Sequence, residues 1–189
     1  MTTRDRFITT VDEFDEFVLR DENIERNFEY IAGKVVEKMV SNDIPGLIAA
    51  RIIIHIGIYL EDNDIGEVFA DSTGFMVNGE RYIPDASYLS YEKHPDVLGV
   101  AYRPDPPDLA IEVVSSERKS EQAILRVKIH NYLVAGTVVW VIDPYLRQVE
   151  IYRTGENTQV LSENAMLVEE NLLPNFKLEI SKLFKRLPE

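Results

Sequence analysis

The chain has 189 residues and a formal net charge of -13, from 33 acidic and 20 basic residues. One domain over residues 1–189 can bury roughly 70% of the surface that its unfolded form would expose, and the absence of cysteine excludes disulfides, thiolate nucleophiles and cysteine-based zinc sites. The acidic balance weighs against general binding of nucleic acid by counterion release, although enzymes that act on nucleic acid through divalent cations need clustered carboxylates.

The first elements predicted are a short helix and a β-hairpin. Residues 1–6 are polar and begin no signal-peptide core. Thr10-Val11-Asp12-Glu13 is a capping-box pattern, so a helix is expected from here to about Leu19. The segments Phe28–Ile31 and Val35–Val40 are strand-like, and the residues between them, Ala32-Gly33-Lys34, predict a hairpin.

A long apolar helix is expected next. Pro45, which is tolerated in a first helical turn, begins a pattern of apolar residues with helical period that continues to Tyr59. The apolar run from Leu47 to Leu60 contains Arg51 and His55, and it is shorter than the roughly 18 to 20 apolar residues that span a bilayer. The segment therefore predicts a central buried helix, and we expect a soluble, cytoplasmic protein with no membrane partner.

The middle of the chain predicts short strands and a long loop. Three extended segments are expected, at residues 66–71, 73–77 and 81–90. Asn78-Gly79 is a turn signal between the last two, so the three segments together suggest a meander. Residues 91–107 contain four prolines and no clean period, which predicts a loop.

A strand, a helix and a second strand are predicted after this loop. The apolar run from Leu109 to Val114 indicates a strand that is apolar on both faces. Residues 119–135 predict a helix that Gly136 ends, and residues 138–142 predict a strand. This order implies that the two strands pair in parallel through a right-handed crossover.

The last part of the chain predicts edge strands at residues 148–153 and 159–161, and a short amphipathic tail that contains Leu183-Phe184. The expected fold class is therefore α/β or α+β. It consists of a mixed sheet with an antiparallel part that includes the N-terminal hairpin, one parallel βαβ crossover and helices against the faces of the sheet.

One charge interrupts the predicted central strand. Glu112 lies among Leu109, Ala110, Ile111, Val113 and Val114, where an ionised carboxylate is unfavourable. Removing such a group from water costs several kcal/mol or more, so a buried glutamate is usually neutralised, paired with a cation or bound to a metal.

A second acid from a neighbouring strand could share this position. Asp108 lies on the same face as Glu112 but four residues away, roughly 13 Å along a strand, which is too far for both to hold one small cation. Asp108 is therefore expected at the entry of the strand. Asp85 belongs to another extended segment, and opposed side chains of paired strands lie about 5 Å apart. Asp85 can therefore reach the same ion as Glu112.

The next helix carries a lysine on its apolar side. Lys128 follows Ile124 and precedes Tyr132 by one helical turn each, so its stem faces the sheet. Its ammonium group could pair with Glu112, stabilise charge on a phosphate or activate a water. A lysine whose head extends to solvent is an equally good reading of the spacing alone.

Other common chemistries lack their patterns. The three histidines have no partners at metal-ligand spacing, and Ser115 and Ser116 lack the Gly-x-Ser-x-Gly turn of a hydrolase nucleophile. The glycines match neither the Walker pattern nor the dinucleotide fingerprint. These absences argue against acyl transfer, nucleotide hydrolysis and hydride transfer.

Several short motifs occur in a characteristic order over nearly the whole chain. They are Phe28–Glu37, Ile83-Pro84-Asp85, Pro107–Ser115, Lys128 with Tyr132, Ala135-Gly136, Val139–Pro144 and Tyr152. Each is weak alone, but their order and spacing resemble the Uma-two family of restriction-endonuclease-like proteins, a branch of the PD-(D/E)XK nuclease superfamily.

The resemblance implies a mixed sheet flanked by helices and metal-dependent hydrolysis of phosphodiester bonds in DNA. It implies that Asp85 is the motif aspartate, Glu112 the second acid and Glu29 a third acid, and that these hold Mg²⁺ or Mn²⁺. In the superfamily pattern a lysine follows the second acid at a spacing of two, where this chain has Val114. Lys128 on the following helix is then the replacement.

Two functional hypotheses follow. The first is a divalent-metal-dependent endodeoxyribonuclease with Asp85, Glu112, Lys128 and Glu29 in its site, acting as a homodimer if it cuts both strands of a duplex. The second is a nuclease-like fold that binds nucleic acid or protein without cleavage. The acidic net charge, Val114 and the loop at residues 91–107 motivate the second hypothesis.

Overall fold

The computed structural model describes residues 8–38 and 42–188. Its helices are α1 (Val11–Val18), α2 (Asp43–Asp62), α3 (Lys119–Val134) and the short 3₁₀ helix η1 (Ile180–Lys182). The strands are β1 (Phe28–Ile31), β2 (Lys34–Glu37), β3 (Gly66–Ala70), β4 (Gly74–Val77), β5 (Glu80–Tyr82), β6 (Ala86–Ser90), β7 (Tyr102–Arg103), β8 (Leu109–Val113), β9 (Val138–Asp143), β10 (Gln148–Tyr152), β11 (Gln159–Ser162), β12 (Met166–Glu169) and β13 (Phe176–Glu179).

These strands form one large sheet and two smaller ones. The large sheet has six strands in the order β11-β10-β9-β8-β6-β3, and only the β8–β9 pair within it is parallel. A second sheet of five strands has the order β2-β1-β5-β4-β7, and β12 pairs with β13 as a separate hairpin. Helix α3 connects β8 to β9, so the predicted mixed sheet and parallel crossover are confirmed.

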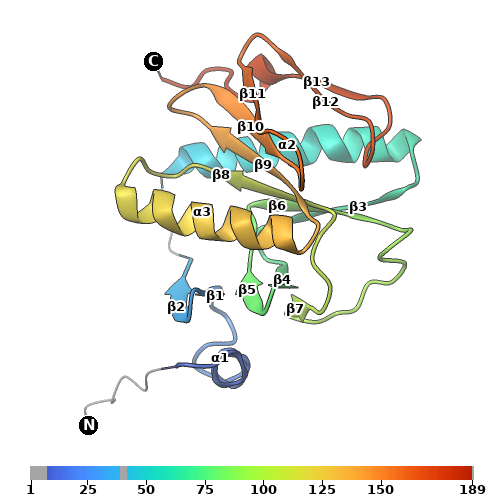
Figure 1. Ribbon diagram of the computed structural model, residues 1–189. Helices are drawn as coiled ribbons and strands as arrows, with labels where there is room; N and C mark the ends of the chain where they lie inside the picture. Colours follow the sequence, from blue (N-terminus) through green and yellow to red (C-terminus); the bar gives the residue numbers. More distant parts are fainter. Residues whose placement is uncertain (1–7, 39–41, 189) are drawn as a thin grey trace.

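The layers of the molecule follow from the two faces of the large sheet. Helix α2 and the β12–β13 hairpin lie over one face, and α3 lies on the other side, above the five-stranded sheet (Figure 1). Helix α1 packs against the outer face of that smaller sheet, where Phe14 contacts Tyr30. The capping box predicted at Thr10 is present at the start of α1.

Alternation along β8 determines where Glu112 points. Leu109, Ile111 and Val113 belong to the core beneath α2, whereas Ala110 and Val114 belong to the core beneath α3. Because side chains alternate along a strand, Glu112 lies on the α3 side together with Ala110 and Val114. The Glu112 carboxylate is thereby directed toward the place where α3 meets the six-stranded and five-stranded sheets.

The predicted meander is wrong, because the expected extended segment at residues 81–90 is divided between two sheets. Strand β5 pairs with β4 and β1 in the five-stranded sheet, whereas β6 pairs with β3 and β8 in the six-stranded sheet. The segment Ile83-Pro84-Asp85 crosses between them. Proline has no N–H to donate to a strand ladder, which explains why the pairing ends there.

Helix α2 is a core helix with one open face. It begins two residues before Pro45, where the Asn42 side chain accepts the backbone N–H of Ile44. By length and composition alone it could cross a membrane, but core helices of soluble proteins meet the same criterion. Here Ile52 and Ile56 are fully buried in the core between α2 and the six-stranded sheet. Ile54 and Ile58 are exposed, so α2 packs on the core with one face only.

Other differences from the predicted elements are local. The predicted loop at 91–107 contains the short strand β7, which pairs in parallel with β4. Strand β10 is not an edge strand, because it pairs on both sides. The β12–β13 hairpin was not predicted, and Leu183 and Phe184 are fully buried rather than part of an amphipathic tail. The predicted end of the second strand, residues 39 and 40, lies outside the described residues.

The close approach of β3 to β6 yields a stability prediction. A Cβ atom on Gly66 would lie 2.3 Å from the carbonyl oxygen of Leu89, which the strand pairing holds in place. We expect Gly66→Ala to lower the free energy of unfolding by about 2 kcal/mol or more, as overpacking does. Gly57→Ala is the matched control, because its Cβ would meet nothing closer than 4.0 Å and alanine favours a helix by about 1 kcal/mol. Urea denaturation that shows equal stability for both variants would contradict this account.

Candidate active site

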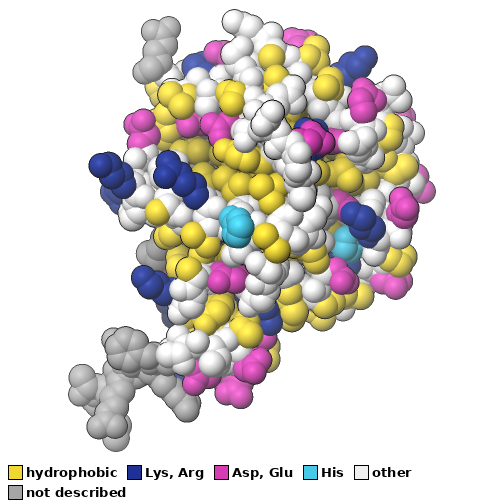
Figure 2. Space-filling view, in the orientation of Figure 1, with side chains coloured by type: hydrophobic (Ala, Val, Ile, Leu, Met, Phe, Trp, Pro, Cys, Tyr) yellow, Lys and Arg dark blue, Asp and Glu magenta, His cyan; other side chains and the backbone are white. Residues whose placement is uncertain are grey.

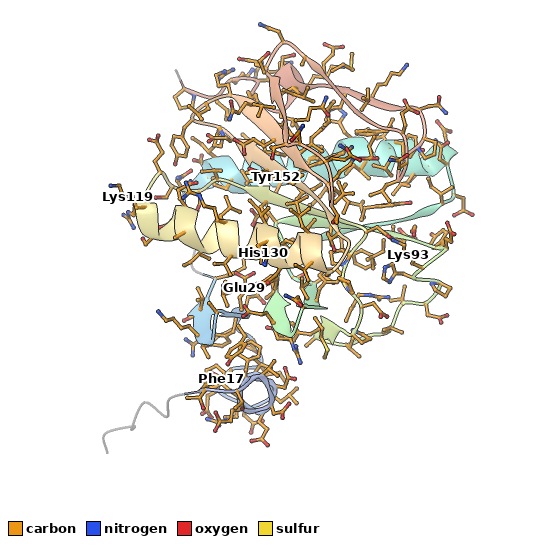
Figure 3. The ribbon with its side chains drawn as sticks, in the orientation of Figure 1. Phe17, Glu29, Lys93, Lys119, His130 and Tyr152 are labelled. Carbon is orange, nitrogen blue, oxygen red and sulfur yellow. The ribbon has the colours of Figure 1, made fainter. Side chains whose placement is uncertain are left out.

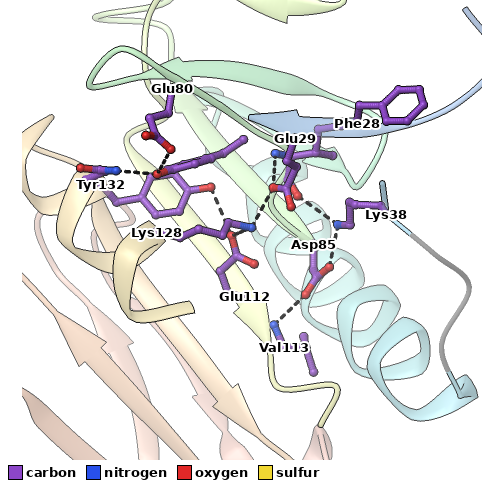
Figure 4. Close-up of polar contacts among 12 residues, drawn as sticks. Phe28, Glu29, Lys38, Glu80, Asp85, Glu112, Val113, Lys128 and Tyr132 are labelled. Atoms are coloured by element: carbon purple, nitrogen blue, oxygen red, sulfur yellow. Dashed lines mark hydrogen bonds and ion pairs between the residues drawn. The ribbon is translucent and has the colours of Figure 1, made fainter. Parts of the chain in front are cut away.

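A groove of about 850 Å³ opens at the junction of the six-stranded and five-stranded sheets. It is lined by the end of β2, the start of α2, the end of β8 and the first turns of α3. The charged side chains at its base are Glu29, Lys38, Asp85, Glu112 and Lys128. Figure 4 shows these five residues converging from different elements. The groove therefore brings together the four candidate residues of the sequence analysis, and it also contains Lys38.

Asp85 occupies the position where the β6–β8 pairing stops. The register of Ala86 with Ile111, if continued, would place Pro84 opposite Val113. The Asp85 carboxylate instead accepts the backbone N–H of Val113, with 2.7 Å between Oδ2 and nitrogen. The backbone N–H of Asp85 donates to the carbonyl of Ile111 at 3.0 Å. Asp85 is thus fixed beside β8, as the sequence predicted.

The crossing segment is held by two other charged residues of the groove. Glu29 Oε1 accepts the backbone N–H of Ile83 at 2.8 Å, and Lys38 Nζ donates to the Ile83 carbonyl at 3.0 Å. Lys38 Nζ also lies 3.0 Å from Oδ1 of Asp85. Glu29 is buried and lines the groove, so its carboxylate does not lie on a solvent-facing side of the hairpin.

Lys128 bridges the two glutamates. Its Nζ lies 2.6 Å from Oε1 of Glu112 and 2.9 Å from Oε1 of Glu29, and only 6% of its side chain is exposed. The hydroxyl of Tyr132, one turn along α3, donates to the same Glu112 oxygen at 3.2 Å. The lysine head is therefore enclosed, and the alternative of a head that extends to solvent is wrong.

Burial and the neighbouring charges favour a protonated Glu112 up to about pH 7 and a charged Lys128. Burial, together with the negative charges of Asp85 and Glu29, raises the pKa of Glu112 to about 7 against the attraction of Lys128. Burial favours the neutral form of Lys128, but the Glu112 and Glu29 carboxylates raise its pKa above the ordinary value. The charges of Asp85 and Glu29 therefore disfavour ionisation of Glu112, and a bound cation would relieve this repulsion.

The donor set suits a hard divalent cation, but lysine side chains are paired with these carboxylates. Carboxylate oxygens are the ligands that Mg²⁺ and Mn²⁺ prefer. Over residues 8–38 and 42–188, no group of three acidic or histidine side chains lies close enough together to bind a metal. The ammonium groups of Lys38 and Lys128 lie against the carboxylates instead. Asp85, Glu112 and Glu29 fit a cation in chemistry, and Asp85 would bind it by exchanging its ion pair with Lys38.

Lys38 is the residue that reasoning from sequence missed. The hairpin register pairs Glu29 with Val36, so these two side chains share a face of the small sheet. Lys38 follows Val36 by two residues and continues on that face, beside the glutamate. The period-two pattern of the predicted hairpin places Lys38 on the same face as Glu29. That the Lys38 side chain meets Asp85 depends on the position of the crossing segment, which the pattern does not give.

Asp108 is not part of the groove, as predicted. Its carboxylate accepts the backbone N–H and the hydroxyl of Ser90, both at 2.8 Å, and pairs with Lys93 at 2.5 Å. In Figure 3 Lys93 lies on the opposite side of the molecule from Lys119, which begins α3 beside the groove. Asp108 therefore stabilises the entry to β8, where the sequence placed it.

Comparisons with known proteins agree with this fold. The family model described as "Uma2: Putative restriction endonuclease" matches residues 11–181. A crystal structure of a "putative nuclease belonging to DUF820" from Anabaena variabilis ATCC 29413 is similar with a TM-score of 0.78. The two sequences are 24% identical, and the match covers 93% of this chain and 97% of the other. No curated protein matches the sequence.

The raised pKa of Glu112 predicts how stability depends on pH without metal. The folded protein holds a proton on Glu112 up to about pH 7, whereas the unfolded chain releases it near 4.5. The contribution of Glu112 to the free energy of unfolding is therefore most favourable below pH 4.5, and it is lost as the pH rises to about 7. Glu112→Gln cannot ionise, so its free energy of unfolding relative to wild type should rise by about 2 kcal/mol between pH 5 and pH 8.

Urea denaturation in EDTA at several pH values measures this difference. Glu163→Gln is the control, because the hydrogen bond from Arg147 lowers the pKa of Glu163, whose titration then lies below this pH range. A constant difference between Glu112→Gln and wild type across the range would contradict the raised pKa.

Proposed function

The chain belongs to the Uma2 family of restriction-endonuclease-like proteins, and we propose that it is a nuclease that hydrolyses DNA phosphodiester bonds with the help of a divalent cation, Mg²⁺ or Mn²⁺. The observation that carries this proposal is the meeting of three carboxylates and a buried lysine in one open groove. Buried charges without a structural need are costly, and their presence in a groove favours a site that binds charged ligands.

Each residue of the site has a role that its contacts support. Asp85, from the crossing segment, and Glu112, from β8, would hold the cation, with Glu29 as an auxiliary ligand. When bound, the cation would polarise the scissile phosphate and lower the pKa of an attacking water. Lys128 keeps its charge between Glu29 and Glu112, and its attraction opposes protonation of Glu112. We therefore assign Lys128 an electrostatic role in positioning the two glutamates.

The surface beside the groove supports a phosphate-bearing substrate despite the acidic net charge. Lysine and arginine side chains gather over the start of α3 (Figure 2), at the end of the helix where Figure 3 labels Lys119. Arg118, which lines the groove, has 81% of its side chain exposed. Local basic side chains of this kind contact phosphates and position a nucleic acid without reading its sequence. Cleavage of both strands would require two sites, which a two-fold homodimer would supply.

Nicking of supercoiled plasmid tests this function. Wild-type protein should nick the plasmid with Mg²⁺ or Mn²⁺ and not in EDTA, and Glu112→Gln and Asp85→Asn should reduce the rate by about 100-fold or more. Glu163→Gln is the control, because Glu163 pairs with Arg147 and does not line the groove. Equal nicking by all four proteins would mean that the activity comes from a contaminant or from another site.

The alternative function is a nuclease fold that binds nucleic acid or protein without cutting. Two observations favour it: Val114 occupies the usual lysine position, and the ammonium groups of Lys38 and Lys128 already neutralise acids that would bind metal. DNA that is bound by wild-type protein but not nicked with either metal would establish this alternative.

Metal binding can be tested separately from cleavage. Mn²⁺ or Ca²⁺ should raise the unfolding temperature of wild-type protein, with a stabilisation of about 1.4 kcal/mol at ten times Kd. The increase should be larger at pH 8 than at pH 5.5, because the cation must displace the proton that Glu112 holds below about pH 7. Asp85→Asn should abolish the increase, and an equal increase in this variant would place the metal elsewhere.

A further inference from the structure

We propose that the ammonium group of Lys38 contacts the scissile phosphate. In the free protein this group pairs with the Asp85 carboxylate and so competes with the divalent cation for it. This inference rests on the proposed nuclease function. It separates two lysines of the same groove into different roles, Lys38 as a substrate-contacting residue and Lys128 as a fixed charge.

Lys128 is too enclosed to serve a substrate. Its Nζ is shared between Glu29 and Glu112 at 2.9 and 2.6 Å, and it lies 5.6 Å from the centre of the Tyr82 ring. Movement toward a phosphate would break both ion pairs and leave two buried carboxylates without a cation, a change that is strongly unfavourable. Lys128 therefore stays in place when the substrate binds.

Lys38 has the freedom that Lys128 lacks. Its side chain is 23% exposed and lines the groove, and its partners among the described residues are the Asp85 carboxylate and the Ile83 carbonyl. Asp85 keeps the bond from the Val113 N–H if Lys38 leaves. Departure of Lys38 thus leaves no buried charge without a partner, and Figure 4 shows its side chain reaching Asp85 from the side away from Lys128.

The charges of the groove leave Lys38 as the cation best placed for a phosphate near the acids. Three basic residues line the groove over the described part of the chain: Lys38, Arg118 and Lys128. Lys128 is held by two glutamates, and the Arg118 side chain is 81% exposed and lies 3.6 Å from Glu121. A phosphate that approaches Asp85 and Glu112 needs a compensating cation, and Lys38 is already bound to Asp85.

The proposal implies an exchange of ion pairs. In the free protein the Lys38 ammonium neutralises Asp85, which weakens the attraction of Asp85 for a divalent cation. When a phosphate enters, the same ammonium transfers its hydrogen bonds to a phosphate oxygen and exposes the carboxylate. Loss of Lys38 should therefore have opposite effects on metal binding and on cleavage. A purely structural role, in which Lys38 supports the Ile83 carbonyl, would impair both.

Two substitutions separate charge from structural support. Lys38→Gln removes the charge but keeps an N–H donor for the Ile83 carbonyl, whereas Lys38→Met removes both. We expect both variants to bind Mn²⁺ about fivefold more tightly in calorimetric titrations. We also expect both to nick plasmid about 100-fold more slowly at saturating Mn²⁺. Lys34→Met is the matched control, since Lys34 lies on the same face of β2, is exposed and does not line the groove.

The outcomes distinguish this inference from the proposed function. Wild-type cleavage by Lys38→Gln, or weaker Mn²⁺ binding in that variant, would overturn the role of Lys38 while the nuclease function stands. If wild-type protein does not nick DNA with either metal, the nuclease function fails, and the contact of Lys38 with a scissile phosphate fails with it. Thermal unfolding checks that each variant is folded, and Lys38→Gln carries the test alone if Lys38→Met does not fold.

Discussion

The constraint on which the site depends is the passage of the chain from one sheet to the other at Ile83-Pro84-Asp85. Proline ends the β6–β8 ladder, so backbone groups at this junction lack strand partners, and buried backbone groups must be paired. Asp85 accepts the Val113 N–H, Glu29 accepts the Ile83 N–H, and Lys38 donates to the Ile83 carbonyl. The charged side chains of the groove are thus also the groups that satisfy the junction, which explains how a local break in pairing can assemble a polar site inside a mostly apolar fold.

The remaining charges of the groove are balanced around this junction. Lys128 neutralises Glu29 and Glu112 from the helix above, and Tyr132 donates to Glu112 from the next turn. Two ammonium groups nevertheless face three carboxylates, and burial keeps the pKa of Glu112 near 7. An arrangement of this kind is a poor solution for stability alone, because buried charges cost more than apolar side chains of similar size. Its cost is understandable if the groove exists to bind a cation and a phosphate.

Reasoning from sequence placed the candidate side chains on their faces more accurately than it paired the strands around them. The faces of Glu112 and Lys128 followed from strand and helix periods, and the structure places both where those periods direct them. The expected meander failed because local strand propensity does not reveal that residues 81–90 serve two sheets. Lys38 was missed for the same reason: its face on the hairpin was predictable, but its pairing with Asp85 depends on how residues 81–90 pass between the sheets. The β12–β13 hairpin was missed as well, although its Leu167 and Leu178 complete the core beneath α2.

The sequence by itself determined the elements that carry the site and the faces from which its side chains project. It did so because apolar periodicity, the capping box at Thr10 and the proline at position 84 act over a few residues. Only the tertiary structure decided which of these faces meet. Glu29, Asp85 and Lys128 are distant in the chain, and their convergence on Glu112 depends on long-range packing of two sheets against α3. The ionisation of Glu112 was likewise undecided by sequence, because a pKa depends on burial and on neighbouring charges that only the folded chain supplies.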